Sequence, residues 1–309
     1  MTSVDIKGSY ATLLLPINKD ETINFDRLRE EIRHLIEASV DGIYSNGTAG
    51  EFYTQNEQEF RQIQEILAHE CTSAGMPFQI GASQMSPQMT LERIIWAKTL
   101  NPSAIQVILS DWFPLTDIEV FTCLERYAAA ADPVGIVLYN PPHAKRMLSP
   151  ELIGRIERSI PGVVGVKVAD GDEQWYARMR QHVQRLSVFV PGHHMATGIA
   201  QGMHGAYSNV SCLSPAGASR WYKMCHQDLK GALELEERIQ QVMRKYILPY
   251  IETEHYCNAA CDKLLAAIGN WAPLGTRLRW PYRWIPEFEA SRLRPHVQKL
   301  VPELFNVVV

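Results

Sequence analysis

The sequence has few cysteines, no long apolar run and almost no charge imbalance, and each of these absences excludes a class of protein. Its six cysteines include no Cys-x-x-Cys pair and are too sparse for a disulfide framework. The longest apolar stretches, such as residues 11–15, are far shorter than a membrane span. Thirty basic and 34 acidic residues give a net charge of −4, which offers no basic surface for nucleic acid or an anionic membrane.

The amino-terminal segment MTSVDIKGSY also lacks the basic start and apolar core of a signal peptide. With the sparse cysteines, this predicts a protein of the reducing cytoplasm. Apolar residues make up 46% of the chain and charged residues 21%, as is typical of a packed globular protein. The 309 residues suffice for one large α/β domain.

Short apolar runs alternate with amphipathic segments along the first 230 residues. Segments such as 25–38, 57–68, 118–130 and 150–158 have apolar residues at helical spacing. We expect eight strands, at 10–15, 42–45, 78–81, 104–109, 135–139, 163–168, 187–190 and 205–208. This alternation favours a parallel sheet closed into a (β/α)8 TIM barrel. The rival, an open doubly wound sheet, should have a Gly-x-Gly-x-x-Gly turn after its first strand, and residues 15–21 contain none.

Beyond residue 230 the pattern predicts helices only. We expect helices at 233–246 and 258–268, a connector rich in Trp and Pro over 271–286, and a last helix near 295–304. The sequence therefore predicts a catalytic barrel over residues 1–230 and a C-terminal helical extension over 231–309. We interpret the extension as an appendage and not as a second catalytic domain.

Polar residues gather at the carboxyl ends of the expected strands, where barrels of this class place their active sites. They occupy positions 46–51, 110–114, 139–143, 192–194 and 208–209. His193 and His194 are adjacent on a segment that we expect to be extended, so they should point in opposite directions and make poor joint metal ligands. We therefore expect no metal.

Lys167, in the stretch GVVGVKVADG, decides the chemistry. A lysine at a strand end ordinarily extends its ammonium into water. Here Val166 and Val168 should face the helices, which turns Lys167 towards the barrel axis. Desolvation there would lower the pKa of the amine and favour attack on a carbonyl. Tyr139, at the end of the preceding strand, either moves protons at the same mouth or packs the barrel rim.

The small-residue turn Gly47-Thr-Ala-Gly50 is the third candidate. Its backbone N–H groups and the Thr48 hydroxyl suit a carboxylate or phosphate, and a plain loop is the alternative explanation.

Three motifs resemble those of the dihydrodipicolinate synthase and N-acetylneuraminate lyase family of class I Schiff-base aldolases. They are Gly47-Thr-Ala-Gly-Glu51, Tyr139-Asn-Pro-Pro142 and Gly165-Val-Lys167, in matching order across residues 8 to about 230. The resemblance implies a (β/α)8 barrel, usually a homotetramer, that acts on pyruvate or another 2-keto acid without a metal or cofactor. It implies that Lys167 forms the imine, that Tyr139 relays protons, and that Gly47 and Thr48 hold the substrate carboxylate.

The sequence also departs from this family's pattern. Members that make dihydrodipicolinate have a second Thr in the turn, a Tyr from a neighbouring subunit and an Arg after the strand-five tyrosine. Here these positions hold Ala49, Phe113 and Ala144. The hydroxyl relay is interrupted, which argues against dihydrodipicolinate synthesis itself.

Other residues near the mouth complete the candidate set. We count Ala49, Phe113, His143 and Tyr207 with Gly47 and Thr48 as candidate substrate-binding residues. Lys145 and Arg146 either bind a distal anionic group or form an exposed basic pair.

These residues favour a Schiff-base lyase or aldolase that makes or breaks a carbon–carbon bond of a 2-keto acid, of the pyruvate or 2-keto-3-deoxy sugar acid type. One alternative is a 2-keto-3-deoxy acid dehydratase that uses the same lysine. The other is a keto-acid-binding protein without catalysis. The expected partners are a small 2-keto acid and further copies of the chain, in a dimer or tetramer, and neither nucleic acid nor membrane.

Overall fold

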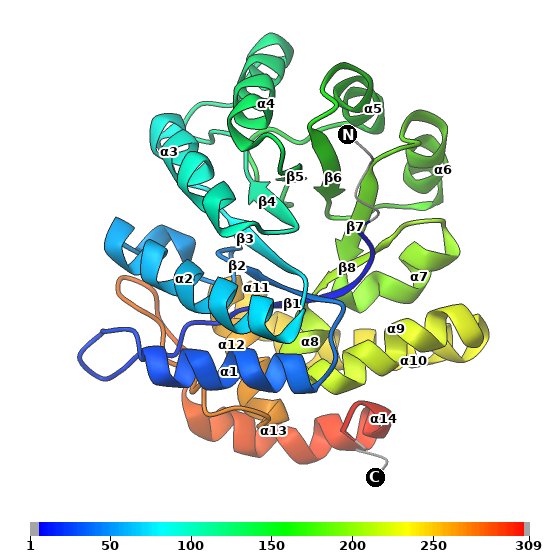
Figure 1. Ribbon diagram of the computed structural model, residues 1–309. Coiled ribbons are helices and arrows are strands. Elements are labelled where there is room, and N and C mark those ends of the chain that lie inside the picture. Colours follow the sequence, from blue (N-terminus) through cyan, green and yellow to red (C-terminus); the bar gives the residue numbers. More distant parts are fainter. Residues whose placement is uncertain (1–5, 306–309) are drawn as a thin grey trace.

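The structure, a computed structural model that describes residues 6–305, is a closed barrel of eight parallel strands (Figure 1). The strands are β1 (Gly8–Thr12), β2 (Gly42–Ser45), β3 (Phe78–Gly81), β4 (Ala104–Val107), β5 (Ile136–Tyr139), β6 (Val163–Lys167), β7 (Ser187–Pro191) and β8 (Gly205–Ser208). Each strand pairs with the next, and β1 pairs with β8 to close the barrel. The predicted (β/α)8 barrel is confirmed.

Helices follow the strands and cover the outside of the barrel (Figure 1). They are α1 (Phe25–Glu37), α2 (Glu57–Ala74), α3 (Pro87–Ala97), α4 (Asp117–Ala131), α5 (Pro150–Ser159), α6 (Glu173–His182), α7 (Met195–Ala200) and α8 (Asn209–Leu213). Short 3-10 helices lie at η1 (Phe52–Thr54), η2 (Lys98–Leu100) and η3 (Gly192–His194). Polar residues cap the helix starts: Asn56 and Thr116, for example, form capping boxes at α2 and α4.

Two predicted strands extend two or three residues too far in sequence, and the sixth, expected to reach residue 168, ends at Lys167. The first was expected at 10–15 and lies at Gly8–Thr12, and the fourth was expected to reach residue 109 and ends at Val107. In both cases apolar residues such as Leu14 and Leu109 remain buried after strand pairing stops. An apolar run in the sequence indicates buried residues and not strand pairing, and here the buried residues continue into the loops that follow the strands.

Side chains of the strands alternate between two apolar layers. Tyr10, Tyr44, Phe189 and Tyr207 belong to a buried cluster inside the barrel. Val166 of β6 and Val168, just beyond it, lie instead in the larger cluster between the strands and the helices. Lys167 lies between them and therefore points inward, as the sequence predicts.

The C-terminal helices pack on one side of this barrel. They are α9 (Pro215–Gln227), α10 (Leu229–Val242), the π-helical η4 (Met243–Ile247), α11 (Leu248–Glu252), α12 (Asn258–Gly269), α13 (Glu287–Leu300) and α14 (Pro302–Phe305). Figure 1 shows α9, α10 and α13 grouped together, and α12 packs against both α8 and α13. The predicted C-terminal helical extension is confirmed. The division after residue 230 falls inside α10 and stays a prediction.

The last predicted helix begins too late. It was expected near 295–304, whereas α13 begins at Glu287 and contains Pro295 within it. Within residues 6–305, no helix combines the length and the apolar character that crossing a membrane requires.

Candidate active site

A cavity of about 410 Å³ opens at the carboxyl ends of the strands. Strand and loop residues on one side include Thr12, Tyr44, Tyr139, Lys167 and Tyr207. The other side belongs to the C-terminal helices, which contribute Gln240, Met243, Arg244, Ile247, Leu248, Ile251, Asn258, Cys261, Asp262 and Leu265. The helical extension is therefore a wall of the cavity, a contribution that the sequence analysis did not predict.

Lys167 lines this cavity and lies among three phenol rings. Its Nζ is 4.0 Å from the ring centroid of Tyr139, and 5.1 and 5.2 Å from those of Tyr44 and Tyr207. Desolvation lowers the pKa of Lys167 to about 8, although the negative charge of Asp262 opposes the change. A larger fraction of the amine is thus neutral near pH 7 than for an exposed lysine, which favours nucleophilic attack.

Tyr139 ends β5 with its ring against the lysine. It is only 8% exposed, and burial raises the pKa of its phenol, with a hydrogen bond to Thr48 opposing the rise. The phenol is therefore protonated near neutral pH and can donate a proton to a group at Lys167. Thr48 belongs to the turn after β2, so β2 and β5 supply neighbouring hydroxyl groups.

The turn after β2 packs tightly against the barrel interior. A Cβ atom on Gly47 would lie 2.7 Å from a ring carbon of Tyr44, so no larger residue fits there without displacing that ring. The Gly50 N–H donates to the Gly47 carbonyl at 3.0 Å, which closes the turn. Thr48 and Ala49 line the cavity, and Gly47 lies behind them against Tyr44.

A buried ion pair links this turn to the C-terminal extension. Lys263 Nζ of α12 is 2.6 Å from Glu51 Oε1, and both side chains are fully buried. Lys263 also donates to the Arg277 carbonyl at 2.6 Å, and the Arg279 N–H donates to Glu51 Oε2 at 3.2 Å. Burial lowers the pKa of Lys263, and Glu51 opposes this by stabilising the ammonium. The ion pair holds α12 in place over the mouth of the barrel.

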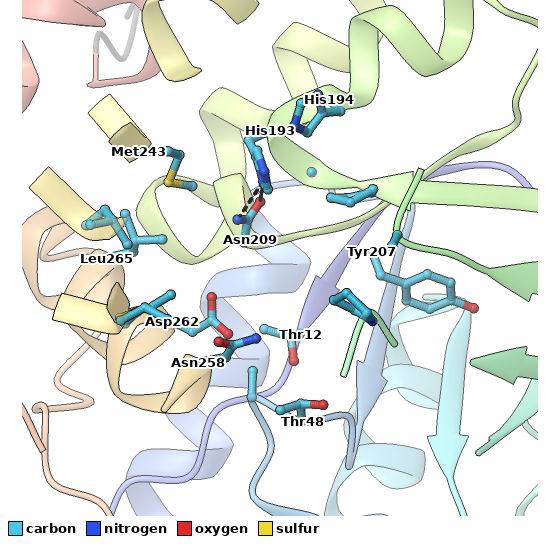
Figure 2. Close-up of a pocket in the computed structure, with 18 of the residues that line it drawn as sticks. Thr12, Thr48, His193, His194, Tyr207, Asn209, Met243, Asn258, Asp262 and Leu265 are labelled. Carbon is cyan, nitrogen blue, oxygen red and sulfur yellow. Dashed lines mark hydrogen bonds between the residues drawn. The ribbon is translucent and has the colours of Figure 1, made fainter. Parts of the chain in front are cut away.

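Asp262, the neighbour of Lys263, is the functional candidate that sequence reasoning missed. It contributes the only carboxylate to the cavity lining within residues 6–305. Burial raises its pKa to about 7, and the positive charge of Lys167 opposes the rise. Figure 2 shows Asp262 and Asn258 extending from α12 towards Thr12. A signal was present in the sequence: Asp262 and Lys263 are two adjacent charges in the otherwise mainly apolar segment NAACDKLLAAIG.

The two histidines after β7 lie differently from the expectation. They belong to the 3-10 helix η3, and their ring centroids are only 4.4 Å apart, so the expected opposite orientation on an extended segment is wrong. The tight turn brings both rings to one side, and both line the cavity. Burial lowers the pKa of His193 to about 4, and its Nδ1 lies 3.0 Å from Nδ2 of Asn209 (Figure 2).

His194 connects this pair of rings to a carboxylate. Its Nδ1 is 3.4 Å from Asp170 Oδ2. In the described chain, residues 6–305, no group of three or more His, Cys, Asp or Glu side chains is arranged to hold a metal ion. The expectation of no metal stays a prediction.

The structure brings five of the predicted site residues to the cavity and leaves three outside its lining. Lys167, Tyr139, Thr48, Ala49 and Tyr207 line it, whereas Gly47, Phe113 and His143 do not. The Tyr207 hydroxyl donates to the Gln79 side chain inside the barrel. The roles of these eight predicted site residues in binding and catalysis stay predictions.

Phe113 and His143 lie on exposed loops. Phe113 is 75% exposed and does not reach the space beside Lys167 within one chain. His143 follows Pro142, which does line the cavity, and burial lowers the pKa of its imidazole. The two basic residues that follow, Lys145 and Arg146, both have partners within the chain. Lys145 donates to the Trp112 carbonyl at 3.0 Å, and Arg146 forms an ion pair with Asp117.

Comparison with known proteins places these features in a wider context. The sequence model of the dihydrodipicolinate synthetase family matches residues 5–263. A curated relative, 4-hydroxy-tetrahydrodipicolinate synthase of Ehrlichia canis (strain Jake), is 28% identical over 174 residues, which are 56% of this chain and 57% of the relative. The chain thus matches little more than half the length of this relative.

Solved structures share the fold over nearly the whole chain. YagE, a prophage protein of the dihydrodipicolinic acid synthase family from E. coli K12, was solved in complex with pyruvate. It superposes with a TM-score of 0.84 at 19% identity, covering 96% of this chain and 98% of that one. N-acetylneuraminate lyase from Fusobacterium nucleatum gives a TM-score of 0.82 at 18% identity, covering 98% and 100%. At these identities the likeness concerns the fold.

Proposed function

The chain belongs to the dihydrodipicolinate synthetase family, and from this membership and the surroundings of Lys167 we propose that it is a Schiff-base lyase or aldolase. It makes or breaks a carbon–carbon bond of a 2-keto acid, of the pyruvate or 2-keto-3-deoxy sugar acid type, without a metal or cofactor. The observation that supports this proposal most directly is Lys167 itself, an inward-facing amine with a lowered pKa and a phenol ring 4.0 Å away.

The proposed chemistry follows from the groups around this amine. The neutral amine of Lys167 adds to the C2 carbonyl of the keto acid, and loss of water leaves an iminium ion. The iminium accepts the electron pair released when the C3–C4 bond breaks, which gives an enamine. Tyr139, protonated near neutral pH, returns a proton to the reacting group. The turn at Gly47 and Thr48 holds the carboxylate of the keto acid through backbone N–H groups and a hydroxyl.

We propose that the aldehyde that reacts with the keto acid is not the one used in dihydrodipicolinate synthesis. Ala49 supplies a methyl group where a relay would need a hydroxyl, and Phe113 is exposed on a loop away from the cavity. Neither can pass a proton from Tyr139 towards solvent.

Trapping with borohydride tests the imine. Pyruvate with borohydride should add a lactyl-type mass at Lys167, located by peptide mass spectrometry. The trapping rate should rise with pH through about 8, as the amine loses its proton. Lys167→Ala should give no adduct, whereas Lys223→Ala, which removes an exposed lysine of α9, should react like the wild type. No adduct with any of a panel of 2-keto acids contradicts the proposal.

Dehydration by the same lysine is the second candidate, and the interrupted relay at Ala49 favours it because β-elimination needs different proton donors. The products separate the two reactions. From a 2-keto-3-deoxy acid, cleavage releases free pyruvate, whereas dehydration gives a deoxygenated keto acid with its carbon chain intact. Saturable keto-acid binding by both wild type and Lys167→Ala, without turnover in either, would instead indicate a binding protein.

A further inference from the structure

The wall that the C-terminal helices contribute to the cavity is mainly apolar. It presents Met243 and Ile247 from η4, Leu248 and Ile251 from α11, and Leu265 from α12. Figure 2 shows Met243 and Leu265 on this side of the cavity. The polar members of this wall are Gln240, Arg244, Asn258 and Asp262, and Arg244 already donates to Gln240. Hydroxyl groups of a polyhydroxylated chain that lie against the apolar residues would lose water without gaining protein partners, which costs free energy for each such group. An alkyl or aryl group gains free energy there by burial.

Asp262 is the carboxylate on this wall, which also carries the cation of Arg244 and the amides of Gln240 and Asn258. In the described chain, residues 6–305, its carboxylate forms no hydrogen bond or salt bridge with another side chain, so its oxygens are available to a ligand. It is partly exposed, and so is Lys167 across the same cavity. The adjacent ion pair between Lys263 and Glu51 fixes the position of α12, and with it the position of the carboxylate.

Among residues 6–305, no other carboxyl group lines the cavity that contains Lys167. Tyr139 and Thr48 are protonated hydroxyls near neutral pH, and Ala49 has no polar atom in its side chain. Asp262 is therefore the carboxyl group of the lining whose chemistry allows it to accept a proton and to return it.

We propose that this wall is the subsite for the aldehyde partner, that the aldehyde has an apolar body, and that Asp262 exchanges a proton with its oxygen. The proposal rests on the Schiff-base function proposed above, and it adds the class of partner and the residue that completes the reaction.

In the cleavage direction every atom and electron pair is accounted for. The Asp262 carboxylate takes the proton of the C4 hydroxyl, and the O–H electron pair becomes the second bond of the aldehyde carbonyl. The C3–C4 bond breaks, its electron pair forms the C2=C3 bond of the enamine, and the iminium π electrons return to the Lys167 nitrogen. Condensation is the reverse, with protonated Asp262 giving its proton to the aldehyde oxygen.

The first test compares aldehydes. The wild-type protein is incubated with pyruvate and either benzaldehyde, hexanal or glyceraldehyde, and the condensation products are measured by mass spectrometry. We expect kcat/KM for benzaldehyde and hexanal to exceed that for glyceraldehyde by about tenfold. Ile251→Asn, which places an amide on the partly exposed part of this wall, should reduce that ratio. Equal or greater reactivity of glyceraldehyde overturns the apolar subsite.

The second test removes the acid–base group. Asp262→Asn should lower kcat for condensation by about 100-fold while borohydride trapping of pyruvate at Lys167 continues. Asp262→Glu should recover part of the activity, because it restores a carboxyl group. Glu252→Gln, which removes an exposed carboxylate on neighbouring α11, is the matched control and should behave like the wild type.

The outcomes separate the two proposals. Trapping of pyruvate by Asp262→Asn shows that this variant is folded and forms the imine, so loss of condensation alone supports Asp262 in proton exchange. Condensation by Asp262→Asn at the wild-type rate overturns that role. Trapping by the wild type without condensation with any of the three aldehydes overturns the subsite alone. No trapping by the wild type overturns the Schiff-base function, and the subsite with it.

Discussion

Lys167 is held in a place that suits its chemistry and not the stability of the fold. Three phenol rings surround its Nζ, and within residues 6–305 no carboxylate forms an ion pair with it. A pKa lowered from 10.5 to about 8 means that the folded protein disfavours the charged amine. The free energy that lowers the pKa of this proposed nucleophile is therefore subtracted from the free energy of folding.

We predict that Lys167→Met is more stable than the wild type at pH 7, by about 1–2 kcal/mol. Below pH 8 both the folded and the unfolded wild-type chains hold the Lys167 proton, so the cost of the buried charge is fully present. From about pH 8 to 10.5 the unfolded chain keeps a proton that the folded chain has lost, and wild-type stability rises. Because Lys167 is partly exposed, solvent screening keeps the gain below the free energy that corresponds to the full pKa shift.

Urea unfolding of both proteins at pH 7 and at pH 10 measures this difference. The advantage of Lys167→Met should shrink at the higher pH, and Lys223→Met, at an exposed lysine, should show no advantage at either pH. A variant less stable than the wild type at pH 7 would contradict the prediction.

At the same scale, the sequence allows Lys167 and Tyr139 to be predicted and does not allow Asp262. The first two end strands whose alternation fixes the direction of the side chain, so local pattern is enough. Asp262 reaches the cavity only because α12 packs against α8, a contact between segments distant in sequence. The orientation of His193 and His194 escaped prediction because it depends on whether the backbone turns or extends after β7.

At the scale of elements, the link between the turn after β2 and α12 determines the shape of the site. Glu51 and Lys263 are both fully buried, and each also bonds to the 277–279 segment. Removing one partner of such a pair leaves a buried charge without compensation.

We predict that Glu51→Gln lowers the free energy of unfolding by about 3–5 kcal/mol. The double variant Glu51→Gln with Lys263→Met should recover part of the loss, because no buried charge then remains unpaired. The control is Glu234→Gln, whose partner Lys230 is 3.9 Å away with both side chains largely exposed, and it should change stability by less than about 0.5 kcal/mol. Chemical denaturation of the four proteins measures these values; equal losses for both single variants would contradict the argument.

The sequence predicts where the strands lie more accurately than it predicts where strands and helices begin and end. Alternating apolar runs predict eight strands, but buried Leu14 and Leu109 extend two of those runs beyond the paired residues. The start of α13 at Glu287 was missed because Pro295 is more typical of a first helical turn than of an interior. Tertiary packing accommodates the proline in this case.

At the scale of the whole molecule, one apolar cluster is shared between the barrel and the extension. Val210 and Leu213 of α8 belong to the same buried cluster as Leu235 of α10 and Leu264 of α12. The extension therefore covers apolar surface that the barrel would otherwise expose to water.

We predict that a chain ending at residue 230 does not fold to a stable barrel, because this surface loses its cover. Circular dichroism should show no cooperative thermal transition for the truncated chain, or the chain should aggregate. The full chain should give one transition, with coincident curves from circular dichroism and tryptophan fluorescence. A soluble truncated chain with a sharp transition would contradict this, and would support an independent unit over residues 1–230.

The buried pair between Glu51 and Lys263 also has a consequence for synthesis. On the ribosome the chain emerges from its amino terminus, so the lysine and tyrosine of the barrel leave the exit tunnel well before α12 does. Until Lys263 follows, the Glu51 carboxylate has no cation and the mouth of the barrel has one wall missing. A nascent chain thus has the proposed nucleophile early and the wall of its cavity late, and the proposed site is complete only after α12 has left the tunnel.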